Sequence, residues 1–127
     1  MISQIKLTNF RKFKNTVFEF KKNLVIFYGH NAQGKSSVLE ALYLINTGLS
    51  PWASTNEFVN VDQSSQMHTR IESIEDCKSY VFFKDKDKRI LKVDGNNSRP
   101  SKFFENRSAN IFNPEKIELL MISMKKR

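Results

Sequence analysis

The feature that most constrains the fold is an eight-residue stretch with the sequence GHNAQGKS, residues 29–36. It fits the pattern G-x-x-x-x-G-K-[ST] at each fixed position. Two glycines let the backbone turn its amide groups inward around an anion, and a following helix points its positive end at the same anion. The pattern therefore predicts a phosphate-binding loop, or P-loop, between a strand and a helix.

The residues before the motif have the patterns of strands. Residues 2–7 and 16–20 alternate apolar and polar side chains, and residues 9–15 between them read as a turn. Residues 24–28, LVIFY, form a continuous apolar run, which predicts a strand buried on both faces directly before the P-loop.

A helix is expected after the loop, from Lys35 to about Asn46. Its apolar residues recur at the i, i+4 and i+7 spacing, at Val38, Leu42 and Ile45. Gly48 occupies the position of a helix C-cap and Pro51 follows as a stop.

The second half predicts an antiparallel meander with strands at residues 67–74, 79–83 and 89–93. The charged run 84–88 reads as a solvated turn, and Asp94 with Gly95 as a tight turn. Further on, Pro114 suits the first position of a short helix that would include residues 116–120.

These patterns together predict an α/β fold of the P-loop type in one domain, residues 1–127, with a mixed sheet and an antiparallel β meander. The site expected to bind Mg-ATP contains nine residues of the loop and the helix start. Lys35 would reach the β and γ phosphates, and the Ser36 hydroxyl would be a ligand of Mg²⁺. The nine are Gly29, His30, Asn31, Ala32, Gln33, Gly34, Lys35, Ser36 and Ser37.

The formal net charge of +8, from 21 basic and 13 acidic side chains, favours polyanionic partners such as nucleic acid or nucleotides. The alternative is a lysine-rich solvated surface. No apolar run is long enough to span a membrane. Cys77 is the single cysteine, so no internal disulfide forms and a cytoplasmic location is expected.

Six segments carry a resemblance to a known family: residues 5–13, 24–28, 31–36, 39–43, 47–50 and 111–120. Through them the chain resembles the RecF family, within the ABC-type and SMC-like repair ATPases. The resemblance implies an ATPase head that dimerises around ATP and binds double-stranded or gapped DNA in replication, repair and recombination, with RecO- and RecR-like partners. It also implies that Arg11 contacts nucleotide phosphates; the alternative for Arg11 is a surface charge in a turn.

The sequence lacks two features of an ABC-type site: an apolar strand ending in Asp-Glu and a Leu-Ser-Gly-Gly-like loop. Glu40 is expected to face outward and Glu57 to lie in a loop, so neither supplies the missing acid. Both features would belong to a carboxy-terminal part, and the chain alone should hydrolyse ATP poorly. The alternatives are a truncated, non-enzymatic module that binds DNA or a partner, and another P-loop repair ATPase or small kinase.

Overall fold

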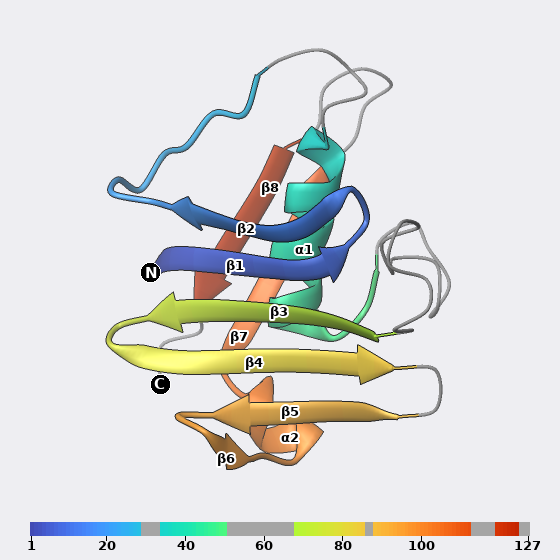
Figure 1. Cartoon of the computed structure of the whole chain (residues 1–127). Helices are drawn as coiled ribbons and strands as arrows, with labels where there is room; N and C mark the ends of the chain where they lie inside the picture. The colour runs from blue at the N-terminus through green and yellow to red at the C-terminus, as the bar shows by residue number, and fades with distance from the viewer. Residues whose placement is uncertain (29–33, 51–67, 86–87, 113–118, 125–127) are drawn as a thin grey trace.

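The computed structural model describes residues 1–28, 34–50, 68–85, 88–112 and 119–124. Its main feature is a six-stranded antiparallel sheet with the strand order β2-β1-β3-β4-β5-β6 (Figure 1). The helix α1 and the antiparallel pair β7–β8 lie behind this sheet, and α1 packs against β7. The elements are β1 Ile2–Phe10, β2 Phe13–Glu19, α1 Lys35–Thr47, β3 His68–Glu75, β4 Lys78–Asp85, β5 Arg89–Val93, β6 Asn96–Asn97, α2 Pro100–Phe103, β7 Arg107–Phe112 and β8 Leu119–Met124.

Tight turns connect consecutive strands of the meander. Asp76 and Cys77 between β3 and β4 have φ angles of 49° and 65°, and Asp94 and Gly95 between β5 and β6 have 50° and 83°. Two successive positive φ angles suit the right-handed twist of a two-residue hairpin. The predicted meander and the predicted turn at Asp94 are therefore confirmed.

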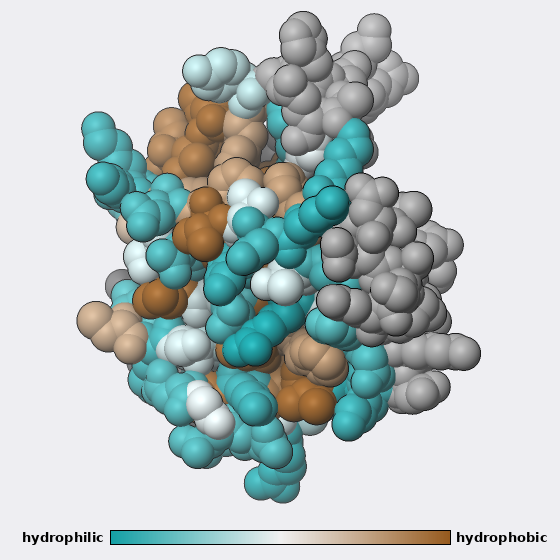
Figure 2. Space-filling model, viewed as in Figure 1, coloured by the Kyte–Doolittle hydropathy of each residue, from teal (hydrophilic) through white to brown (hydrophobic). Residues whose placement is uncertain are grey.

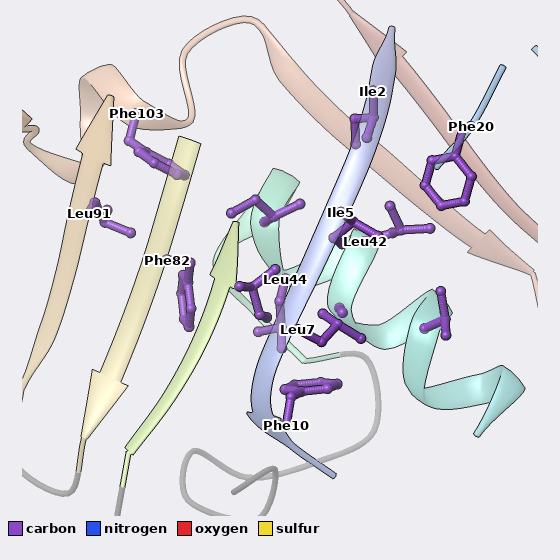
Figure 3. Close-up of a cluster of buried hydrophobic side chains, with 14 residues drawn as sticks. Ile2, Ile5, Leu7, Phe10, Phe20, Leu42, Leu44, Phe82, Leu91 and Phe103 are labelled. Atoms are coloured by element: carbon purple, nitrogen blue, oxygen red, sulfur yellow. The ribbon is translucent and has the colours of Figure 1, made fainter. Parts of the chain in front are cut away.

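The core is built on one face of the sheet because alternate side chains of a strand point the same way. The register aligns Leu7 with Ile71, and Ile71 with Phe82. Phe82 in turn is opposite Leu91 on β5, so one row of buried apolar side chains crosses four strands (Figure 3). The alternation predicted for residues 2–7 is confirmed, since Ile5 and Leu7 are both fully buried and Lys6 between them is only partly buried.

Helix α1 begins and ends where the sequence predicts, within one residue. Gly48 takes the left-handed conformation with φ 79°, and its N–H donates to the Leu44 oxygen at 2.8 Å. The sheet and the β7–β8 pair both contact α1, so the helix is buried on more than its apolar stripe. Its buried residues are Val38, Glu40, Ala41, Leu42, Leu44, Ile45 and Asn46.

The prediction of a buried strand at residues 24–28 is wrong. The segment has no regular secondary structure, and Leu24, Ile26 and Tyr28 are each more than 70% exposed. Only Phe27 is anchored, edge-to-face against Phe18 and Phe20. An apolar run favours burial, but a central strand also needs neighbouring strands on both sides, and none of the described strands pairs with this segment.

The predicted short helix near the end of the chain is also corrected. Leu119 and Leu120 belong to β8, which pairs with β7 from Leu119 opposite Phe112 to Met124 opposite Arg107. Residues 119–124 are stabilised as a strand by pairing with β7. This tertiary pairing outweighs the local preference for a helix that the proline indicates. Residues 113–118, including Pro114, lie outside the described part.

A buried ion pair links the two layers. Arg107 on β7 donates through Nη1 to Glu75 on β3, and its Nη2 donates to the Ile45 oxygen of α1 at 3.0 Å. The guanidinium also lies 4.1 Å from the ring centroid of Tyr80. Both charged side chains are almost fully buried, so this contact fixes how β7 and the end of α1 sit against the sheet.

The outer face of the sheet is mostly hydrophilic, with separate apolar islands (Figure 2). Val17 and Ile74 are large apolar side chains on its strands that are exposed, at 48% and 38%. Within the described residues, no helix is long and apolar enough to cross a membrane.

Candidate functional site

The site begins at the amino end of α1, where Gly34 is the N-cap. Gly34 has φ 86° and ψ 16°, a left-handed conformation that side chains rarely adopt. Its oxygen accepts the first hydrogen bond of the helix, from the Val38 N–H at 3.1 Å. The N–H groups of the first turn therefore point out of the amino end of the helix, where the positive end of the helix dipole lies.

The ring of Phe13 on β2 covers Gly34. A β-carbon placed on Gly34 would lie 2.9 Å from Cζ of Phe13, which is too close for a real contact. Phe13 is itself held edge-to-face by Phe18, with ring centroids 5.6 Å apart. Glycine is therefore favoured at position 34, because another residue would strain the backbone angle and displace the Phe13 ring.

Arg11 occupies the turn between β1 and β2 and faces the middle of α1. Its Nε donates to Oε1 of Glu40 at 2.8 Å, and its Nη2 donates to Oε2 at 2.9 Å. The hydroxyl of Ser50 donates to the same Oε2 at 2.6 Å. The expectation that Glu40 faces outward is wrong: its side chain is fully buried, because a carboxylate with three donors is tolerated inside.

The described residues contain five of the ten predicted site positions. Gly34 precedes the helix, and Lys35, Ser36 and Ser37 form its first turn, each partly buried. Arg11 lies against the same helix through Glu40. The other five, Gly29, His30, Asn31, Ala32 and Gln33, lie outside the described residues, so the assignment of the whole loop stays a prediction.

Glu40 is the residue of this cluster that the sequence patterns did not identify. Its only sequence signal is an acidic residue amid Leu39, Ala41 and Leu42 on a helix. A helix covered on one side would leave such a residue exposed, and the second cover on α1 is visible only in the fold.

The family assignment follows from the domain match. The model of the AAA domain family matches residues 4–123, which include most of the first strand, the glycine-rich loop and α1. The chain belongs to the AAA domain family.

Within this AAA domain group, the chain is similar to the DNA replication and repair protein RecF. It is 36% identical over 134 residues to RecF of Acetivibrio thermocellus, covering 94% of this chain and 33% of that protein. It is 47% identical over 62 residues to RecF of Clostridium kluyveri, covering 48% of this chain and 17% of that protein. The chain thus spans about a third or less of these relatives.

Solved structures agree with the sequence comparison. The AAA domain chain matches the recombination mediator protein RecF in complex with ATP, from the RecFOR pathway, with a TM-score of 0.72 and 28% identity. The match covers 83% of this chain and 30% of that one. The predicted RecF resemblance and the P-loop ATPase-head fold are confirmed.

Proposed function

We propose that this chain is the nucleotide-binding lobe of a RecF-like DNA-repair ATPase. The observation that carries the proposal is the left-handed Gly34 immediately before Lys35, at the point where α1 begins. That conformation and helix start are what a G-x-x-x-x-G-K-[ST] loop needs in order to aim its amides and its lysine at phosphates. The likeness to RecF bound to ATP supports the same reading.

In this proposal residues 29–37 hold the phosphates of Mg-ATP. The Lys35 ammonium neutralises the β and γ phosphates, and the Ser36 hydroxyl is a ligand of Mg²⁺, because this small hard cation prefers oxygen. Arg11 lies against the same helix from the β1–β2 turn, with its guanidinium paired to Glu40. No acid suited to activate water has been identified in the sequence, so binding of ATP without rapid hydrolysis is expected of the chain alone.

The proposal also includes the partners expected of a RecF-like protein. A RecF-like head dimerises around ATP and holds double-stranded or gapped DNA, with RecO- and RecR-like proteins, in the cytoplasm. The net charge of +8 supports a polyanionic partner. The similarity to RecF supports DNA as that polyanion.

Calorimetric titration of Mg-ATP into the 127-residue chain tests the proposal. Lys35→Ala should weaken binding by at least about tenfold, since it removes the cation that faces the phosphates. Lys102→Ala is the matched control because Lys102 is an exposed lysine on α2. Equal binding by the natural chain and Lys35→Ala would contradict a functional P-loop.

A further inference from the structure

Three separate segments of the chain meet at the carboxylate of Glu40. Arg11 comes from the β1–β2 turn, Glu40 from α1, and Ser50 from the segment that follows α1. The Ser50 hydroxyl reaches back ten residues, so the chain after the Gly48 cap returns along the helix. Glu40 is thus the point where the turn and the returning segment are both joined to α1.

The geometry at Glu40 fixes the direction of the arginine. Two parallel N–H···O bonds of 2.8 and 2.9 Å join the planar guanidinium to both carboxylate oxygens. Such a bidentate pair sets the plane of the arginine as well as its distance. Because Glu40 is fully buried, the pair is shielded from water on the carboxylate side.

The β1–β2 hairpin contacts α1 at a second point. Phe13 covers Gly34 at the helix cap, while Arg11 binds Glu40, six residues further along. Six residues correspond to about 9 Å of helix. Because the hairpin contacts α1 at two places about 9 Å apart, it cannot rotate about either contact. Its position relative to the amino end of α1 is therefore fixed.

A carboxylate on the helix that follows the proposed phosphate site would repel nucleotide if it acted directly. Its charge is instead matched by Arg11, and the Ser50 hydroxyl donates to the same carboxylate oxygen. We infer that Glu40 is a positioning residue of the nucleotide site, which fixes Arg11 and Ser50 against α1 without contacting phosphate itself. The inference rests on the proposed function, since it concerns how that site is held.

A matched pair of variants separates positioning from general stability. Glu40→Gln keeps the size of the side chain but loses the charge that holds Arg11. Glu75→Gln is the control, because Glu75 is a second nearly buried carboxylate paired with an arginine. The Arg107 partner of Glu75 contacts α1 at Ile45, ten residues beyond Lys35, so this pair lies at the opposite end of the helix.

Mg-ATP is titrated into the 127-residue chain and into each variant, at a temperature where circular dichroism shows them folded. Both variants should lower the midpoint of thermal unfolding. Only Glu40→Gln should weaken Mg-ATP binding, by roughly tenfold, because misplacement of a binding group weakens its contacts. Glu75→Gln should change the affinity by less than about twofold.

Arg11→Lys provides a second, milder test, because the Arg11 side chain is 25% exposed. Lysine keeps the positive charge but cannot form the bidentate pair with Glu40, so the affinity for Mg-ATP should fall as in Glu40→Gln. Combined with Glu40→Gln it should cause little further loss, since both changes break one interaction.

Each outcome decides the inference. If folded Glu40→Gln and Arg11→Lys bind Mg-ATP like the natural chain, or if Glu75→Gln loses as much affinity, Glu40 has no positioning role. Failure of the natural chain itself to bind Mg-ATP overturns the proposed function and this inference with it. The titration of the natural chain against Lys35→Ala distinguishes the two kinds of failure.

Discussion

The ring of Phe13 lies directly over Gly34, with its Cζ atom 2.9 Å from the place where a β-carbon on Gly34 would be. The contact joins a strand that begins at residue 13 to the first residue before α1. It means that the start of the helix is positioned by the β1–β2 hairpin as well as by its own hydrogen bonds.

Replacing Gly34 with alanine should therefore destabilise the fold more than the backbone angle alone requires. Gly95 provides the comparison, because it has a similar φ of 83° and nothing within 4 Å of the added β-carbon. Gly95→Ala should cost about 1 kcal/mol of unfolding free energy, and Gly34→Ala about 1–2 kcal/mol more, because the Phe13 ring is displaced. Urea unfolding of both variants measures the difference.

The excess is assigned to Phe13 by a double substitution. Phe13→Leu shortens the side chain, so Gly34→Ala should cost less in that background than in the natural one. Equal costs in the two backgrounds would show that the ring is not the source of the excess.

The buried pair of Glu75 and Arg107 should contribute far more than the exposed pair of Arg70 and Glu72. Arg107→Leu leaves a carboxylate without its cation in the interior, which should cost about 3–5 kcal/mol. Arg70→Leu removes a partner that is 46% exposed and should change stability by less than about 1 kcal/mol. The two variants are compared by urea unfolding, and similar losses would show that burial does not set the difference.

Two substitutions in segment 24–28 test whether it is irregular and mostly exposed, as in the structure, or a buried strand, as the sequence pattern predicts. Ile26 is 73% exposed, so Ile26→Ala should alter the unfolding free energy by no more than about 0.5 kcal/mol. Phe27→Ala should cost about 2–3 kcal/mol, because its ring packs on Phe18 and Phe20. A loss of several kcal/mol for Ile26→Ala would instead indicate the buried strand that the sequence pattern predicts.

The proposed DNA contacts should depend strongly on salt. With only two phosphates neutralised, binding should weaken by roughly tenfold between about 50 and 200 mM salt, because counterions are released on binding. Fluorescence anisotropy with labelled duplex and gapped DNA measures the slope. An affinity that salt leaves unchanged would argue against phosphate contacts.

Local patterns were sufficient for much of the fold. The α1 boundaries follow from apolar spacing and from the left-handed conformation that Gly48 provides. The β5 strand follows from the pattern of residues 89–93, which ends at the turn residues Asp94 and Gly95. In these cases the interacting residues are only a few positions apart in the sequence, so a local pattern is enough to predict the structure.

The environments of Glu40 and of residues 24–28 could not be obtained in the same way. One acidic residue on a helix is buried because a distant arginine and a second layer of structure enclose it. One apolar run is exposed because none of the described strands pairs with it. The sequence by itself determined the phosphate-binding motif, the helix and the meander, whereas tertiary structure decided which side chains find partners, because burial depends on what packs alongside.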